Sequence, residues 1–486
     1  MRIYLLNPPY FPHFGREMRW QDTGRGGTLY YPIWLSYATG VLENKGHDVR
    51  LVDAPAWDWG IEKVMEDLRK FSPDMVVVGT SFPSVNNDLD VSKKIKNELD
   101  ADVPAIMVGP PTSQFPEKML DGGVDIVARY EYDFTLAELV ERMERNGRIG
   151  DISGISFKQN GKVIHNPNRP WSTSGELDGL PFVSEVYKRH LNIRDYFLNY
   201  SLYPMVQVFT GRGCPHRCTF CSWPQSFMGR KYRVRRVENI LNELEWIEAN
   251  LPEVKEVFFE DDTLTIDKRR VLEFCKGYRE TGLEITWSCN ARADTLDLET
   301  MREMRRANCR FLIVGFESGD DEILKKIKKG FTTGQTEEFA RNVKKAGLLL
   351  HADFIIGLPG ETKETIEKTR RFIKEIKPEQ VQVSVSSPFP GTELYEWCRE
   401  NGYLLTDDPN EYLDEEGHQK AIISYPSLSS EEMVKEVDKM LKDYYMSLGY
   451  VPLAVRQVLR RHSMDEMKRL WHSARMFMGY IGGRGE

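Results

Sequence analysis

Short apolar runs alternate with polar, helix-like segments over much of the chain. In the first part the apolar runs cover residues 3–6, 49–52, 75–79, 105–108 and 125–128. Helical patterns lie between them, for example at residues 60–71 and 86–99. Apolar strands joined by helices predict a parallel sheet that is covered on both faces, and such sheets bind ligands at the carboxyl ends of their strands.

A second series of the same kind begins near residue 200. A predicted hairpin with its turn at Asn160-Gly161 precedes it. The strands of this series are expected at residues 205–210, 256–260, 285–290, 311–315, 352–357 and 380–384. Six strands with helical crossovers predict a partial (β/α)6 barrel, in which the chemistry belongs at the C-terminal strand ends.

These patterns predict an α/β protein of four parts. They are a Rossmann-like (flavodoxin-like) domain at residues 1–149, a linker with the hairpin at 150–200, the partial barrel at 201–400 and a helical C-terminal region at 401–486. A length of 486 residues agrees with more than one domain.

Composition and charge narrow the function classes. The net charge of -8 argues against general nucleic-acid binding, and seven cysteines, an odd number, do not predict a disulfide framework. No stretch has the length and apolarity of a membrane span, and the first residues do not form a signal peptide, so we expect a cytoplasmic protein. Residues 451–486 carry seven Lys or Arg against three acids, with apolar side chains interleaved. This tail predicts either peripheral contact with an anionic membrane or a helical cap on the barrel.

Three of the cysteines crowd into eight residues directly after a predicted strand. Cys214, Cys218 and Cys221 have the spacing C-x3-C-x2-C. Soft thiolates select iron–sulfur clusters or zinc, and a structural zinc site needs four protein ligands. Three thiolates on a [4Fe-4S] cluster leave one iron open to a substrate or cofactor. The alternative is a zinc loop that uses His216 or a distant fourth ligand.

Further sequence blocks follow the cysteine loop. They are Trp223-Pro-Gln, Lys231-Tyr-Arg-Val-Arg-Arg, Trp287-Ser-Cys-Asn-Ala, Gly315-Phe-Glu-Ser-Gly and Ile355-Ile-Gly-Leu-Pro-Gly-Glu. With the cysteine loop, they make residues 1 to about 400 resemble the radical S-adenosylmethionine (SAM) superfamily, in its branch with an N-terminal cobalamin (B12)-binding-like domain. Within that branch the sequence is most similar to the hopanoid-biosynthesis, lipid-modifying members. The resemblance implies that the open iron takes SAM and that one electron then cleaves SAM to a 5′-deoxyadenosyl radical.

The resemblance also implies which side chains hold SAM. Phe220 would place its backbone against the adenine, and Arg292 would pair with the methionyl carboxylate. Glu317 and Ser318 stand at the ribose motif, and Gly357 stands in the block that contacts adenine. The acids Glu260, Asp261 and Asp262 replace the family's Gly-Gly-Glu motif, which binds the methionyl amino group, so the choice among the three acids stays open. The alternatives are a solvated acidic turn and a surface arginine.

Two further residues are candidates inside the barrel. Cys289 is the candidate catalytic residue, since a thiol that points into the barrel could return a hydrogen atom to a substrate radical. Its alternative is a buried and inert cysteine. His351, at the start of a strand, is expected to have a packing role.

The first domain resembles a cobalamin domain that lacks the usual ligand. Many such domains use Asp-x-His-x-x-Gly, with His below the cobalt, whereas Asp53-Ala54-Pro55 places proline at that position. Cobalamin would therefore bind without a histidine ligand, against a wall formed by Thr80, Ser81, Ser84, Gly109, Pro110 and Glu131. The alternative is a cobalamin-free domain that shapes the substrate cavity.

The function expected from these features is reductive cleavage of SAM followed by hydrogen abstraction from an unactivated carbon. On the subfamily likeness, the substrate is an apolar small molecule or lipid of the hopanoid or isoprenoid type, and the product has a new carbon–carbon bond or ring. The electron would come from a donor such as ferredoxin or flavodoxin. The alternatives are a cobalamin-dependent C-methyltransferase, an enzyme like the anaerobic tetrapyrrole cyclases, and a metal-binding module without catalysis.

Overall fold

The N-terminal part of the chain is built on a seven-stranded sheet. The computed structural model describes residues 1–24, 26–99, 102–459 and 463–483. The sheet has the order β2-β1-β3-β4-β5-β6-β7. Its parallel strands are β1 (Arg2–Asn7), β2 (Asp48–Asp53), β3 (Met75–Gly79), β4 (Ala105–Val108) and β5 (Ile126–Ala128). The hairpin of β6 (Ile155–Gln159) and β7 (Lys162–His165) continues the sheet in antiparallel pairing.

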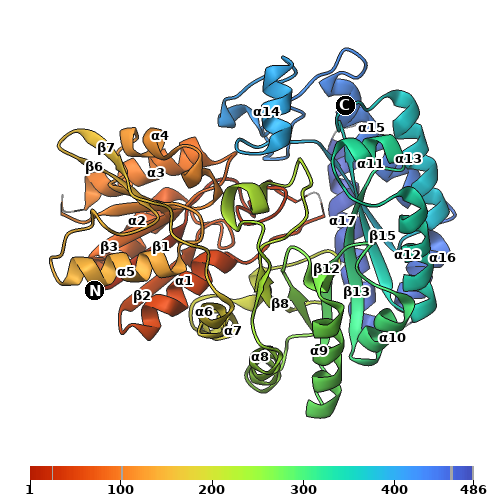
Figure 1. The fold of residues 1–486 in the computed structure, drawn as a ribbon, viewed down its shortest axis with the longest axis horizontal. Coiled ribbons are helices and arrows are strands. Elements are labelled where there is room, and N and C mark those ends of the chain that lie inside the picture. Colours follow the sequence, from red (N-terminus) through yellow and green to blue (C-terminus); the bar gives the residue numbers. More distant parts are fainter. Residues whose placement is uncertain (25, 100–101, 460–462, 484–486) are drawn as a thin grey trace.

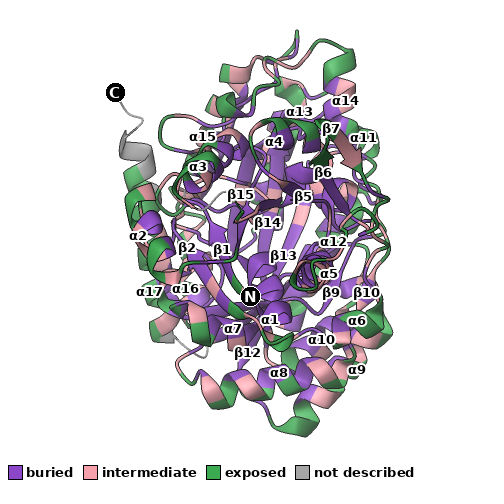
Figure 2. Cartoon of the chain, turned by 90° about the vertical axis from the view of Figure 1, so that its left-hand side faces the viewer, coloured by how far each residue is buried: buried purple, intermediate pink, exposed green. Residues whose placement is uncertain are grey.

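Helices cover both faces of this sheet, as the alternation of side chains along β1 requires. Ile3 and Leu5 pack in one core with α1 (Ile33–Asn44), α5 (Asp133–Glu144) and α7 (Val183–His190). Tyr4 and Leu6 pack in the other with α2 (Ile61–Phe71), α3 (Val85–Glu98) and α4 (Pro116–Asp121). Figure 2 shows the parallel strands buried, whereas strand β7 of the hairpin and the outer faces of the helices are partly exposed.

The second body is a six-stranded parallel sheet in the order β15-β14-β13-β12-β11-β8. Its strands are β8 (Met205–Val208), β11 (Glu256–Phe259), β12 (Thr286–Ala291), β13 (Cys309–Glu317), β14 (Leu349–Ile356) and β15 (Gln380–Val385). Helices lie outside it, as Figure 1 shows: α8 (Val237–Asn250), α9 (Lys268–Thr281), α10 (Leu298–Arg306), α12 (Thr333–Ala346) and α13 (Lys363–Ile376). Strands β8 and β15 stand at the two ends of this order and do not pair with each other, so the barrel is not closed. The arrangement is the partial barrel that the sequence predicts.

The segment between β1 and α1 leaves the first domain and runs along the barrel. Leu29 pairs with Phe197 in an antiparallel bridge. The amide of Tyr31 donates to Gln207 on β8 at 2.8 Å, and its hydroxyl donates to the carbonyl of Met205 at 2.8 Å. The first domain therefore contributes a wall to the barrel cavity.

The C-terminal region contains α14 (Glu393–Glu400), α15 (Ser430–Tyr445), α16 (Val451–Val458) and α17 (Ser463–Gly483). Helix α17 is held to the barrel by a buried ion-pair chain. Arg310, near the start of β13, pairs with Glu256 at 2.7 Å and with Glu466 of α17 at 2.7 Å, and Glu466 also pairs with Arg469 at 2.9 Å. Among the described residues, no helix combines the length and the apolarity needed to cross a membrane. The contacts of α17 favour the predicted helical cap.

Candidate functional site

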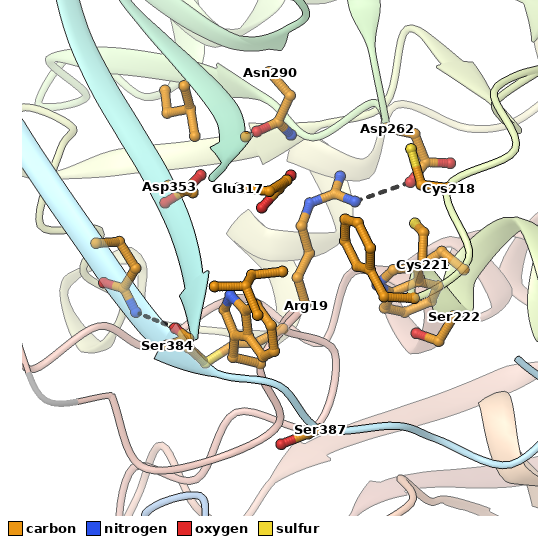
Figure 3. Close-up of a pocket in the computed structure, with 18 of the residues that line it drawn as sticks. Arg19, Cys218, Cys221, Ser222, Asp262, Asn290, Glu317, Asp353, Ser384 and Ser387 are labelled. Carbon is orange, nitrogen blue, oxygen red and sulfur yellow. Dashed lines mark hydrogen bonds and ion pairs between the residues drawn. The ribbon is translucent and has the colours of Figure 1, made fainter. Parts of the chain in front are cut away.

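A cavity lies inside the barrel and is closed on one side by the first domain. Its walls come from the cysteine loop, from the carboxyl-terminal halves of the barrel strands and from the segment between β1 and α1, which contributes Met18, Arg19, Trp20 and Tyr30. Figure 3 shows Arg19, Cys218, Cys221, Asp262 and Glu317 facing the same space. The site is therefore composite, since Arg19 reaches into it from a segment 243 positions before Asp262.

Cys214, Cys218 and Cys221 all line this cavity and all are free thiols. Burial raises the pKa of the Cys214 and Cys221 thiols, with the nearby Asp262 adding to the effect, so metal ions would be needed to hold them as thiolates. The loop is pinned by backbone contacts: a Cβ at Gly213, where φ is +86°, would lie 2.3 Å from the Lys231 carbonyl oxygen. Gln225 closes the loop by donating to the Cys221 carbonyl at 2.7 Å.

The three acids after β11 have three different roles. Asp261 stabilises the fold, because it accepts hydrogen bonds from the amide and the hydroxyl of Thr210, both at 2.6 Å. Glu260 accepts from Gln207 at 2.8 Å, and burial raises its pKa to about 8. Asp262 lines the cavity, and its Oδ2 is buried without a hydrogen-bond partner in the described parts of the chain. Asp262 is thus the acid with an acceptor free for the ammonium group of SAM.

Arg19 is a site residue that the sequence did not reveal. It lies between the acids and Glu317 in Figure 3, donates to Asp262 Oδ1 at 2.9 Å and lies 3.7 Å from Glu260. Its partner Asp262 is 243 positions away along the chain, and no motif marks it. Residues 18–37 are rich in aromatic side chains, but such a composition does not identify an arginine as a site residue.

Cationic and acidic side chains continue along the cavity wall. Arg292 forms a two-pronged pair with Asp294, with both contacts at 3.0 Å, and its Nη1 lies 3.8 Å from Cys218 Sγ. Glu317 is ion-paired with Lys329 at 2.6 Å. A register shift in β13 next to Glu317, whose φ is +68°, turns this side chain into the cavity. Phe220 also lines the cavity, with the Lys329 ammonium 5.8 Å from its ring centroid.

The wall formed by β14 and β15 carries polar side chains beside the apolar Ile355 and Val385. His351 Nε2 lies 2.8 Å from Asp353 Oδ1, and the other ring nitrogen lies 3.2 Å from Gln380 Oε1. His351 therefore lies on the cavity wall inside a hydrogen-bond chain, which goes beyond the packing role expected for it. Other polar side chains on this wall are Gln382, Ser384, Ser386, Ser387 and Gln419.

Five residues predicted for the SAM site or for catalysis do not line the cavity, and Glu260, which bonds to Gln207, is one of them. Cys289 does not line it, and its thiol contacts the thiol of Cys309, so the expectation that Cys289 points into the barrel is wrong and its inert alternative fits. Trp287, two residues earlier on the same side of β12, packs against Phe274 of the outer helix α9. Asp261 is occupied by Thr210, as described above.

The other two belong to the loops behind the cavity. The Ser318 hydroxyl accepts from the Asp320 amide at 3.2 Å and supports that turn. Gly357, with φ of +93°, is covered by α15, since a Cβ there would lie 2.7 Å from Met433 Sδ. Both residues lie at strand ends, and neither lines the cavity.

The residues proposed for cobalamin divide into two groups. Thr80, Gly109 and Pro110 line a narrow cleft at the carboxyl ends of β3 and β4. Gly109, with φ of +125°, allows close approach there, because a Cβ would lie 2.2 Å from the Thr80 carbonyl oxygen. The Thr80 hydroxyl is buried and has no hydrogen-bond partner among the residues that the structure describes. The Thr80 hydroxyl is therefore a hydrogen-bonding group at these strand ends that a ligand could use.

The second group consists of Ser81, Ser84 and Glu131, which form hydrogen bonds or ion pairs with other residues of the protein. Ser81 and Ser84 bond to each other at 2.7 Å, and Ser84 donates to Asp88 at 2.6 Å. Glu131 forms a two-pronged pair with Arg233 of β10 (Arg233–Val234), with both contacts at 2.8 Å, so it joins the two domains and lies outside the cleft. These three residues are therefore not free to contact a corrin.

Comparison with known protein families finds one match in the first domain and one in the barrel. The model of the B12 binding domain matches residues 23–140, and the model of the radical SAM superfamily matches residues 208–373. An uncharacterized methyltransferase of Pyrococcus horikoshii is 29% identical over 475 residues, which cover 95% of each chain. The hopanoid C-3 methylase of Methylococcus capsulatus is 28% identical over 392 residues, 78% of this chain and 70% of that protein.

The fold agrees with a solved structure of the same domain pair. The radical SAM methyltransferase TsrM from Kitasatospora setae, with cobalamin and a [4Fe-4S] cluster bound, superposes with a TM-score of 0.72 over 99% of both chains at 16% identity. The two family models confirm the predicted cofactor set of cluster, SAM and cobalamin. In this chain Cys214, Cys218 and Cys221 would hold the cluster, and Asp262 and Arg292 would face SAM. The protein is a radical SAM enzyme of the branch that carries an N-terminal B12-binding domain.

Proposed function

We propose that this enzyme methylates a carbon atom of a polar small molecule. The observation that carries the proposal is the contact between the two cofactor sites. Trp223 lines both the barrel cavity with the three cysteines and the cleft with Thr80 and Gly109. When bound, cobalamin supplies a transferable methyl group, and cluster and SAM supply the radical that activates the substrate carbon. The adjacency of the two sites supports methyl transfer over ring formation without cobalamin, the main expectation from the sequence.

The chain's own residues would hold and shield the reactants. Asp262 and Arg292 offer a charge partner to each end of the methionyl group, and Arg19 neutralises the acids while it closes the cavity towards the first domain. Water is kept out by packed aromatic rings: Trp223 packs edge-on against Phe227 at 5.4 Å, and Phe227 against Trp34 at 4.7 Å. Exclusion of water protects a carbon radical from side reactions.

The polar wall supports a polar substrate. His351 bonds to Asp353 at 2.8 Å and Gln382 donates to Ser384 at 3.3 Å, but each of these groups has further hydrogen-bonding capacity. A hydrocarbon lipid would leave that remaining capacity unsatisfied in a desolvated cavity, which is costly. A substrate with hydroxyl, amide or amino groups would satisfy them. This wall is the reason that we prefer a polar molecule to the expected hopanoid or isoprenoid lipid.

The experiment uses SAM with a deuterated methyl group. Anaerobically reconstituted protein with cluster and cobalamin is incubated with polar and lipid fractions of the source cells, and both fractions are searched for the CD3 label. We expect label in a polar compound, with S-adenosylhomocysteine and 5′-deoxyadenosine as co-products. Label in the lipid fraction would contradict the polar-substrate argument. Deoxyadenosine without S-adenosylhomocysteine would favour the cyclase-like alternative.

Contact of the C-terminal tail with membranes stays a prediction. The outer surface of α17 exposes Met464, Met467 and Trp471. Co-sedimentation with vesicles that contain anionic lipid measures this contact, and replacing Trp471 with Ser should reduce any binding because it removes a large ring that is 74% exposed.

A further inference from the structure

The connection between β1 and α1 carries neighbouring side chains into two different sites. Arg16 and Glu17 line the narrow cleft at the carboxyl ends of β3 and β4. The next three residues, 18–20, line the barrel cavity. The whole connection spans residues 8–32, whereas a connection of this kind in α/β proteins is typically about 2–6 residues long. We call residues 16–20 the strap, because the chain passes within them from one cofactor site to the other.

The first part of the strap is fixed to the first domain. Arg16 forms a buried two-pronged pair with Asp88 of α3, with contacts of 2.7 and 3.3 Å, and donates to Asn7 at the end of β1 at 3.1 Å. The carboxylate of Glu17 accepts from the amide of Trp34, in the first turn of α1, at 2.7 Å. These contacts hold the start of the strap in the wall of the cobalamin cleft.

The second part of the strap is held to the barrel by Arg19. Its guanidinium donates to Asp262 Oδ1 at 2.9 Å and to the Asp261 carbonyl at 3.4 Å, and it lies 3.7 Å from Glu260. Figure 3 shows the guanidinium directed at Asp262. The Arg19 side chain is 31% exposed, whereas Arg16 is buried, so the attachment to the barrel is the weaker of the two.

SAM would act on the same carboxylate as Arg19. Asp262 Oδ2 has no hydrogen-bond partner within the described residues and is the acceptor assigned above to the SAM ammonium group. Two cations on one carboxylate repel each other, so bound SAM weakens the Arg19–Asp262 ion pair. The contacts of Arg16 and Glu17 lie in the first domain, outside this competition.

The cobalamin cleft has room for a corrin only when its walls separate. It holds about 280 Å³ of empty space, which is below the roughly 300–1,000 Å³ of a site for a drug-sized ligand, and cobalamin is much larger than such a ligand. Thr80 and Gly109 of the first domain form one wall, and Trp223 and Phe227, which follow the cysteine loop, form the other. Because the Arg19–Asp262 ion pair joins the first domain to the barrel, it opposes the separation of these walls.

We propose that the strap couples the two cofactor sites: SAM on Asp262 weakens the Arg19–Asp262 ion pair and thereby raises the affinity for cobalamin. Cobalamin must then raise the affinity for SAM by the same factor, because coupling between two sites is reciprocal. Arg19 is in this sense a positioning residue, since it acts through Asp262 and the strap. The inference depends on the cofactor set and on Asp262 as the ammonium acceptor, and it is independent of the substrate and of methyl transfer.

The test measures cofactor binding without turnover. Protein from cells grown without cobalamin receives its cluster anaerobically, and no reductant is added. Equilibrium dialysis then gives the dissociation constant of hydroxocobalamin with and without saturating SAM. We expect SAM to lower this constant about fivefold in wild type, the lower end of the usual range for coupled sites, because the ion pair is partly exposed. In Arg19→Gln the constant should already be about fivefold lower without SAM, and SAM should then leave it unchanged.

Two control variants separate the strap from a general loss of charge. Arg19→Lys keeps a cation on Asp262 and should keep the coupling. Arg50→Gln removes an arginine of similar exposure, 38% against 31%, from a two-pronged pair with Asp67 that lies outside both sites. This variant should bind both cofactors as wild type does. Arg19→Gln should also bind SAM more tightly than wild type in the absence of cobalamin, because the competing cation is gone.

Two results would overturn the proposal. If SAM leaves the affinity of wild type for hydroxocobalamin unchanged, the two sites are not coupled. If SAM still lowers the dissociation constant about fivefold in Arg19→Gln, the coupling runs through another contact, such as Trp223, and not through the strap. The iron content of each variant, measured beside its binding constants, shows that the cluster loop is intact.

Discussion

Replacing Asp262 with Asn should weaken SAM binding without removing the cluster. The unpartnered Asp262 Oδ2 is the acceptor available to the SAM ammonium group. A hydrogen bond to a charged group is worth about 1.5–3 kcal/mol, which is about 10-fold to 150-fold in dissociation constant. Arg19 already shares this carboxylate at 2.9 Å, so we expect the lower part of that range, about 10- to 30-fold. Equilibrium dialysis of SAM against the anaerobically reconstituted protein measures the change.

The neighbouring acids supply matched controls. Asp261→Asn should leave SAM affinity close to that of wild type and lower the free energy of unfolding, because Asp261 holds Thr210 through two 2.6 Å contacts. Iron and sulfide content should stay the same in Asp262→Asn. If Asp262→Asn binds SAM as tightly as wild type while Glu260→Gln loses it, the ammonium is bound by Glu260 and the reasoning from the open oxygen fails.

Three further predictions test separate parts of the structure. Cys289→Ala should leave the yield of product, measured by chromatography, unchanged, since the thiol faces Cys309; a large loss of product while 5′-deoxyadenosine still forms would restore the hydrogen-donor role. Glu466→Gln should lower the unfolding free energy by about 3 kcal/mol in denaturant titration, because it breaks a buried pair with Arg310; an unchanged midpoint would mean that α17 is not a structural cap. Burial raises the pKa of Asp53 to about 6, so folding takes up a proton and wild-type stability falls as pH rises from about 4 to about 6. Asp53→Asn removes this contribution, and its stability relative to wild type should improve by about 3 kcal/mol over that window, whereas a constant difference would contradict the raised pKa.

The local pattern of apolar and polar residues predicts most of the fold. The strands expected at residues 75–79 and 105–108 agree with β3 and β4, and the barrel strands agree within a few residues because buried parallel strands are continuous apolar runs. The cysteine spacing likewise predicts the cluster loop, since three candidate ligands within eight residues of one loop need no long-range information. The acids at residues 260–262 could also be predicted as site candidates from local sequence, because they directly follow a predicted barrel strand and the chemistry of such barrels lies at the C-terminal strand ends.

Tertiary structure alone decided how these parts are used. Sequence placed Glu260, Asp261 and Asp262 together, but only the positions of Thr210 and Arg19 show which oxygen is open. Cys289 faces outward because alternate residues of a strand point to opposite sides, and the phase of that alternation is fixed by packing against the helices outside. Trp223 lines both the barrel cavity and the cleft of the first domain, and the cavity walls join segments far apart in sequence, so the pattern within any one segment could not reveal them.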